Sequence, residues 1–104
     1  EDELKEEENR IIQRTETTWL VDGLLSIDEF KEYFGINKEL PGEEKDLYKT
    51  VGGFLTYLFG RIPKELDRYV WETYTFEIVD MDNVRIDKIM VVHEPIEETV
   101  AADE

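Results

Sequence analysis

A pair of strand-like stretches in the last third of the chain constrains its fold most. Residues 74–81, YTFEIVDM, and residues 84–92, VRIDKIMVV, are rich in the β-branched and aromatic side chains that suit a pleated, half-buried surface. Only Asp82 and Asn83 separate them, and this pair tolerates the positive φ angles of a two-residue hairpin turn. We therefore expect an antiparallel hairpin here.

The apolar pattern of the second stretch changes phase along the strand. Val84 and Ile86 lie on one parity, whereas Ile89 and Val91 lie on the other. Successive side chains of a regular strand point to opposite faces, so these four cannot share a face without an irregularity. The pattern predicts a bulge or twist between Ile86 and Ile89.

The first third of the chain predicts a strand followed by a turn. Residues 11–21, IIQRTETTWLV, combine β-branched and aromatic residues and favour an extended entry and a first strand. The strand is expected to end at Asp22 and Gly23.

A short helix is predicted at residues 26–34. Ser26 and Glu29 have the spacing of a capping box, in which the hydroxyl accepts from the Glu29 amide and the carboxylate reaches back to the Ser26 amide. Asp28 in the same turn favours the positive end of the helix dipole. Gly35 stands where a left-handed C-terminal cap is expected.

A second helix is predicted around residues 51–59. Its apolar residues recur at helical spacing: Val51, Phe54, Leu55, Leu58 and Phe59. Thr50 is the expected N-cap, Gly60 the C-terminal cap and Pro63 a stop shortly beyond. Gly52 and Gly53 form a pair inside this helix, and each glycine lowers helix stability by on the order of 1 kcal/mol relative to alanine. Close approach of another backbone is the preferred reason, and a phosphate-binding turn is the alternative, although the known glycine-rich phosphate motifs are absent.

These elements, with a further strand in RYVWE at residues 68–72, predict an α+β fold. Two short helices should pack on a small, mainly antiparallel sheet. At 104 residues the chain supports one small domain. We place this domain at residues 11–92, between an acidic linker at 1–10 and an acidic tail at 93–104.

The net charge of −15 is concentrated at the two ends of the chain. Residues 1–8 hold six acidic side chains and residues 94–104 hold five, whereas the span 9–93 holds 16 acids and 11 bases. Nucleic acid is an unsuitable partner because phosphate binding needs clustered lysine and arginine. The absence of cysteine excludes disulfides and thiolate chemistry. No apolar run approaches the ~20 residues that span a bilayer, and a start at Glu1 without methionine suggests a piece of a longer protein.

No catalytic or metal-binding constellation stands out. Asp22, Asp28 and Glu29 are close in sequence, but turn and capping roles explain them better than a hard-cation site. The single histidine, His93, is expected to be exposed at the exit of the last strand, without a nucleophile beside it. We therefore predict no catalytic and no metal-ligating residue, and a protein that is not an enzyme.

Two weaker signals leave ligand binding open. Eight aromatic residues could build a stacking surface for a base or a flavin, although most are expected in the core: Trp19, Phe54, Tyr57, Phe59, Tyr69, Trp71, Tyr74 and Phe76. Arg61, Arg68 and Arg85 are candidates for pairing a phosphate, but their spacing forms no fork.

In combination, several motifs resemble the CorC/HlyC transporter-associated domain over about residues 11–92. They are LVDG at 20–23, an SIDE helix start at 26–29, T-x-x-G at 50–53, FGRIP at 59–63, F-E-I-V-D-M-D at 76–82 and R-I-x-x-I-x-V at 85–91. The motif residues expected to have structural roles are Asp22, Gly23, Ser26, Asp28, Glu29, Thr50, Gly53, Gly60, Arg61, Pro63 and Asp82. Leu66 and Asn83 depart from the family, which often has glycine at these positions.

The resemblance implies a function that the residues alone do not supply. Such domains close the C-terminal end of proteins with a membrane domain and a pair of CBS domains, some called magnesium and cobalt efflux or haemolysin-like proteins. The resemblance implies that this chain is an accessory or regulatory module at the cytoplasmic face of the membrane. The partners of such a module are the CBS and membrane domains of the same chain. The fold is related to part of FAD-binding domains, so binding of FAD or an adenine nucleotide is one alternative, and homodimerisation is another.

Overall fold

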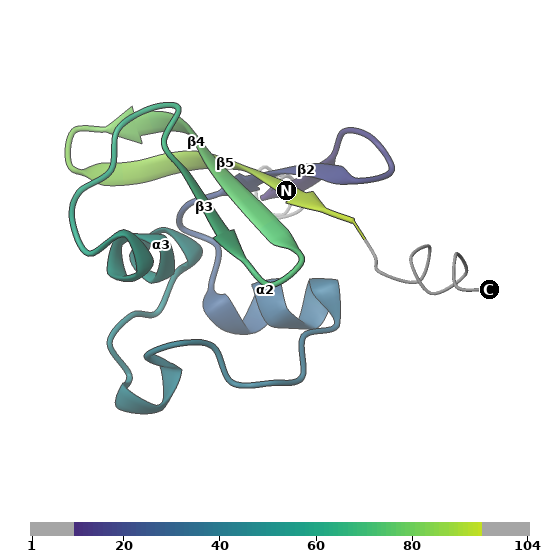
Figure 1. Ribbon diagram of the computed structural model, residues 1–104, viewed down its shortest axis with the longest axis horizontal. Coiled ribbons are helices and arrows are strands. Elements are labelled where there is room, and N and C mark those ends of the chain that lie inside the picture. The colour runs from purple at the N-terminus through teal and green to yellow at the C-terminus, as the bar shows by residue number, and fades with distance from the viewer. Residues whose placement is uncertain (1–9, 95–104) are drawn as a thin grey trace, which may run out of the picture.

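A five-stranded sheet with helices on one face makes up residues 10–94, which are the residues that the computed structural model describes (Figure 1). In chain order the elements are β1 (Ile11–Gln13), β2 (Thr18–Asp22), α2 (Ile27–Phe34), the 3₁₀ helix η1 (Glu43–Lys45), α3 (Val51–Phe59), β3 (Arg68–Trp71), β4 (Tyr74–Asp82) and β5 (Arg85–His93). The strand order is β1-β2-β5-β4-β3, and all neighbours are antiparallel. The predicted α+β class is confirmed.

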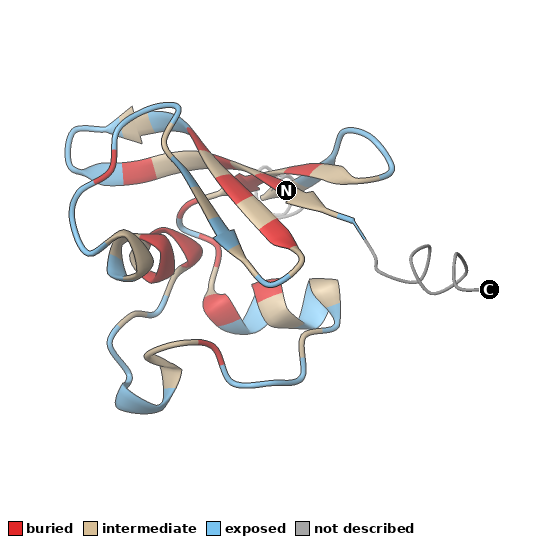
Figure 2. Cartoon of the chain, in the orientation of Figure 1, coloured by how far each residue is buried: buried red, intermediate tan, exposed pale blue. Residues whose placement is uncertain are grey.

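The core lies between the sheet and the two α-helices, as the buried positions in Figure 2 show. Phe30 of α2 and Phe54 of α3 are fully buried, and their rings lie 6.2 and 6.1 Å from that of Phe76 in β4. Phe76 therefore packs against both helices, on the face of the sheet that the helices cover. The remaining buried apolar residues are Trp19, Val21, Leu25, Ile27, Leu40, Val51, Leu55, Tyr74, Ile78, Ile86, Ile89 and Val91.

The predicted hairpin is confirmed as β4 and β5, but its turn lies one residue later than expected. Asp82 is the last residue of β4 and pairs with Arg85, so the loop consists of Asn83 and Val84. Asn83 takes the positive φ, 64°, that asparagine tolerates. The Asp82 carboxylate accepts from the Arg85 guanidinium at 2.8 Å, which keeps Asp82 in the strand pair.

The predicted irregularity of β5 is also confirmed. Lys88 pairs with Asp80 and Ile86 pairs with Met81, so Asp87 between them has no partner in β4. This extra residue lets Ile86 and Ile89 both face the core, where both are buried. A second register shift leaves Val79 of β4 unpaired, which the sequence pattern did not indicate.

The predicted strand that ends at Asp22 is confirmed as β2, but the extended entry before it forms a strand of its own, β1, which the sequence did not indicate. The segment folds into β1 and β2, which pair with each other across the turn at residues 14–17. The Arg14 amide donates to the Thr18 carbonyl at 2.8 Å, and the hydroxyls of Thr15 and Thr18 are 2.7 Å apart. These threonines raise strand propensity in the sequence, but here their hydroxyls close a turn.

Both helices begin and end where the sequence predicted. Ser26 Oγ accepts from the Glu29 amide at 3.1 Å, and Thr50 Oγ1 accepts from the Gly53 amide at 3.1 Å. Gly35 and Gly60 end the helices at φ 69° and 71°. Among the described residues only the serine half of the capping box is formed, since the Glu29 carboxylate makes no bond to the Ser26 amide.

The loop between the helices contains η1, which the sequence did not predict. The Glu43 carboxylate accepts from the Leu40 amide at 2.8 Å and from Lys31 Nζ of α2 at 2.9 Å. Both bonds favour the ionised form, so the Leu40 amide and then Lys31 hold the pKa of Glu43 below its usual value. A charge pair formed only in the folded state thus ties this loop to α2.

Leu66 adopts a backbone conformation that suits glycine. It lies in a four-residue turn closed by the bond from the Asp67 amide to the Lys64 carbonyl at 3.0 Å, and its φ is 78°. Positive φ at the third position of such a turn usually requires glycine, because a Cβ crowds the following carbonyl. The Leu66 side chain is 73% exposed, so little packing offsets this strain.

Replacing Leu66→Gly should therefore stabilise the domain by about 0.5–1 kcal/mol, since relief of strain exceeds the added freedom of the unfolded chain. Thermal unfolding should show a melting temperature roughly 2–6 °C higher. Asn83→Gly is the matched control and should gain less, because asparagine already tolerates positive φ. An unchanged or lower melting temperature for Leu66→Gly would contradict this assignment of strain.

Candidate functional site

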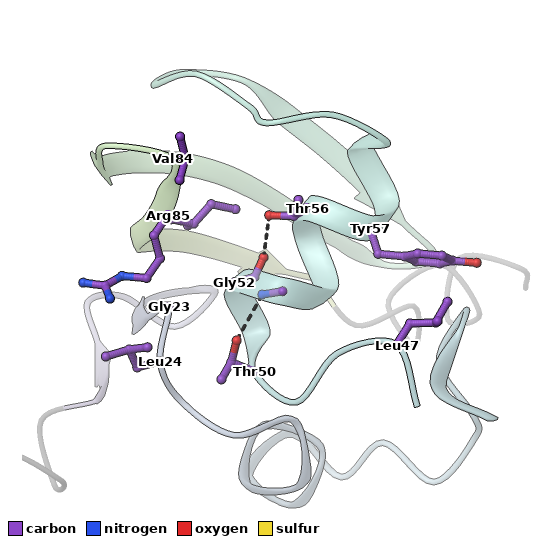
Figure 3. A pocket seen from close by; sticks show the side chains of 11 residues that line it. Gly23, Leu24, Leu47, Thr50, Gly52, Thr56, Tyr57, Val84 and Arg85 are labelled. Carbon is purple, nitrogen blue, oxygen red and sulfur yellow. Dashed lines mark hydrogen bonds between the residues drawn. The ribbon is translucent and has the colours of Figure 1, made fainter. Parts of the chain in front are cut away.

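A groove with a volume of about 560 Å³ lies beside the start of α3 (Figure 3). Four segments enclose it: the β2–α2 turn, the loop between η1 and α3, the β4–β5 turn and the helix itself. We call it the α3 groove. Its lining residues are Gly23, Leu24, Leu47, Thr50, Gly52, Gly53, Thr56, Tyr57, Val84, Arg85 and Ile86.

The floor of the α3 groove is a close contact between backbones. A Cβ added at Gly23 would lie 2.0 Å from the Ile86 carbonyl oxygen, and one added at Gly52 would lie 3.0 Å from the Gly23 oxygen. The Gly52 amide donates to that same Gly23 oxygen at 2.9 Å. The predicted reason for the glycine pair, close approach of another backbone, is therefore confirmed for Gly52.

The start of α3 has no amide left for a phosphate. The first four amides donate to Leu25 O, Gly23 O, Thr50 Oγ1 and Thr50 O, in the order Val51, Gly52, Gly53, Phe54, at 2.9 to 3.1 Å. A helix N-terminus binds anions through amides that lack a partner. The alternative interpretation of the glycine pair as a phosphate-binding turn was therefore wrong.

The rim of the α3 groove is apolar and exposed. Leu24 and Val84 lie on one side, and Leu47 and Tyr57 lie on the other (Figure 3). Their exposed fractions are 46%, 61%, 53% and 42% in that order. Arg85 adds a positive charge on the Leu24 side, paired with Asp82. Such a surface fits a partner with apolar side chains better than it fits a polar small molecule.

The acids that drew attention in the sequence have local roles and do not converge. Asp22 Oδ1 accepts from the Leu24 amide at 2.8 Å and so shapes the turn into the α3 groove. Asp28 and Glu29 are exposed in the first turn of α2. No group of three or more potential metal ligands was found among residues 10–94.

The motif residues lie in several parts of the fold. Gly23, Thr50 and Gly53 line the α3 groove, whereas Ser26 caps α2 outside it. Gly60, Arg61 and Pro63 follow the other end of α3. There Arg61 donates to Asp67 at 3.0 Å, and Pro63 is buried. Sequence reasoning missed the apolar rim of the groove. The only sequence feature that indicates this rim is the presence of large apolar residues within turns.

The three arginines considered for phosphate binding each face a carboxylate. Arg61 pairs with Asp67 at 3.0 Å, Arg68 with Glu77 at 3.4 Å and Arg85 with Asp82 at 2.8 Å. The pairs come from different parts of the fold and form no common site.

Perturbed acid–base groups also lie apart from one another. Burial, followed by the charge of Glu43, raises the pKa of Tyr48 to about 12. Partial desolvation, followed by the neighbouring Asp87, raises the pKa of Asp80 at the bulge. Neither group lines the α3 groove, so neither supplies it with an acid or a base.

His93 is less exposed than predicted. It is the last residue of β5, and its ring stacks on that of Tyr74 at 4.1 Å with an angle of 8°. Its Nδ1 lies 3.1 Å from the Thr73 hydroxyl. The prediction failed because strand β5 continues through His93 and keeps the ring against β4.

Comparison with known proteins gives the family. The model of the transporter associated domain, CorC_HlyC, matches residues 12–95. The chain belongs to this family. A solved transporter associated domain from a Xylella fastidiosa haemolysin, in complex with Mg²⁺ and Mn²⁺, is 31% identical with a TM-score of 0.69 and covers 83% of this chain and 99% of its own.

Curated relatives of this transporter associated domain are much longer proteins. UPF0053 protein sll0260 of Synechocystis sp. is 45% identical over 94% of the chain, which spans 22% of that protein. The polyamine export protein of Haemophilus influenzae is 39% identical over 82% of the chain, which spans 19% of it. The magnesium and cobalt efflux protein CorC of Escherichia coli is 34% identical over 88% of the chain, which spans 30% of that protein. Within residues 10–94, no helix has the length and apolar character to cross a membrane.

The packing at Gly23 gives a direct test of how the groove is built. Gly23→Ala should lower the free energy of unfolding by about 3 kcal/mol, because the new Cβ meets backbone that cannot rotate away. Gly35→Ala is the matched control and should cost about 1 kcal/mol, since it meets only open space at a positive φ. Urea unfolding measures both. Equal losses would contradict the close packing described for Gly23.

Proposed function

We propose that this transporter associated domain is a non-enzymatic accessory module of a cation-exporting membrane protein that also contains CBS domains. Its family and its small share of the longer relatives support this proposal. One of these relatives is named for polyamine export and another for magnesium and cobalt efflux. The module acts at the cytoplasmic face of the membrane, on the CBS or membrane domain of its own chain.

The apolar rim of the α3 groove is the observation that carries this proposal. Leu24, Leu47, Tyr57 and Val84 lie in turns or on the outer side of α3, and burying them is not needed to complete the core. Exposed apolar groups gathered around one groove are typical of interaction surfaces. A partner on the same chain meets this surface at a high effective concentration, so a modest contact suffices.

The geometry gives less support to one of the other two functions considered. A nucleotide or flavin module needs amides or cations for its phosphates, and the amides at the start of α3 already have acceptors. Homodimerisation through the α3 groove is a competing use of the same apolar rim. It would appear as a dependence of molecular mass on the concentration of this chain.

Charge placed on the rim should separate transport from folding. In the full-length protein, Val84→Glu or Leu24→Glu should reduce export of its cation, because a carboxylate would be buried against the partner domain. Each change should alter the stability of the 104-residue chain by less than about 0.5 kcal/mol, since both positions are exposed. Cation content of cells and thermal unfolding measure the two effects.

Val70→Glu is the matched control, because Val70 is 64% exposed and does not line the α3 groove. Cation export by the full-length Val70→Glu variant should equal that of the unchanged protein. Normal export by both groove variants would contradict the proposal, and so would a full-length protein without CBS domains or membrane-spanning segments.

A further inference from the structure

A second pocket lies between the loop that follows α2 and the β3–β4 turn. It has a volume of about 290 Å³ and is lined by residues 35–38 together with Trp71, Glu72 and Tyr74. We call it the hairpin pocket. It shares no residue with the α3 groove, so it is a separate surface of the domain.

Aromatic rings form one side of the hairpin pocket and are held in place by the core. Trp71 and Tyr74 pair across β3 and β4, and their rings stack at 5.7 Å with an angle of 26°. Trp71 also meets Phe54 edge-on at 6.4 Å, and Tyr74 stacks on His93. The face of an aromatic ring attracts cations, most strongly for tryptophan.

A carboxylate that already holds an alkylammonium group stands beside these rings. Both oxygens of Glu72 accept from Lys38 Nζ, at 2.8 and 2.9 Å. The two side chains are 45% and 58% exposed, so their pairing contributes little stability and is readily exchanged. The lysine side chain is itself an aminobutyl group, so the position of this carboxylate is compatible with an alkylammonium partner.

The backbone at Glu72 is strained for a glutamate. It is the first residue of the two-residue turn between β3 and β4, and its φ is 57°. Glycine or asparagine normally occupies such a turn position. A glutamate held there at a cost to stability points to a use for its carboxylate. Its charge also reaches the rings, because burial and then Glu72 raise the pKa of Tyr74.

We propose that the hairpin pocket binds an ammonium group of a linear aliphatic polyamine. The Glu72 carboxylate pairs with the ammonium, the Trp71 ring covers the methylene chain, and Lys38 competes for the carboxylate when the ligand is absent. One carboxylate beside aromatic faces suits an organic cation better than a divalent metal, which needs several oxygen ligands. The span 9–93 holds 16 acids and 11 bases, and its net negative charge favours the approach of the remaining ammonium groups.

Nuclear magnetic resonance of the 104-residue chain with spermidine tests the proposal. Amide and indole signals of residues 35–38 and 71–74 should shift and saturate, with weaker binding for putrescine and weaker still for butylamine. Magnesium chloride at matched ionic strength should leave these signals in place. Shifts that fail to saturate, or that magnesium reproduces, would overturn the proposal. A probe for a partner protein's lysine is Nα-acetyl-lysine amide, which keeps its side-chain ammonium group. Tighter binding of this probe than of spermidine would overturn the proposal in favour of such a lysine.

Two substitutions at Glu72 separate binding from folding. Glu72→Asn should weaken spermidine binding at least tenfold and raise the melting temperature, because asparagine tolerates positive φ. Glu72→Gln should weaken binding equally without raising the melting temperature. Lys38→Met should strengthen binding by up to about fivefold, since it removes a competitor of modest strength. Unchanged affinity in both Glu72 variants would overturn the proposal, and this result is independent of export by the α3 groove variants.

Discussion

The contact of three backbone segments at Gly23, Gly52 and Ile86 determines how the two layers of this domain fit together. Gly23 accepts from the Gly52 amide at 2.9 Å, and its own amide donates to the Asp87 carbonyl at 2.9 Å. A single hydrogen-bonded glycine thus joins the β2–α2 turn, α3 and β5. Helix α3 can approach the sheet so closely because neither glycine carries a side chain.

The bulge in β5 belongs to the same arrangement. Asp87 is the extra residue of the bulge, and its carbonyl is the acceptor for the Gly23 amide. The bulge therefore has two effects. It turns both Ile86 and Ile89 into the core, and it directs the Asp87 carbonyl towards the β2–α2 turn. The β4–β5 turn, which precedes the bulge in the chain, forms one wall of the α3 groove, so the geometry of the groove depends on the bulge.

Sequence reasoning succeeded where a feature is local. The caps at Ser26 and Thr50 follow from side-chain bonds to amides three residues away, and the bulge follows from a change of apolar parity within one strand. It failed where the outcome depends on distant partners. The split of residues 11–21 into two strands needs their mutual pairing, and η1 needs the bond between Glu43 and Lys31. The exposed rim of the groove could not be predicted, because an apolar residue in a turn does not reveal whether the fold covers it.

Native-state hydrogen exchange of the Gly23 and Gly52 amides tests most directly whether the three-segment contact holds the layers together. Both amides should exchange only through global unfolding, with a free energy of opening equal to that measured by urea unfolding. Amides of the η1 loop should open more easily, since that loop lies outside the contact. Rapid exchange at Gly23 and Gly52, while amides of β4 and β5 remain protected, would contradict the central place given to this contact.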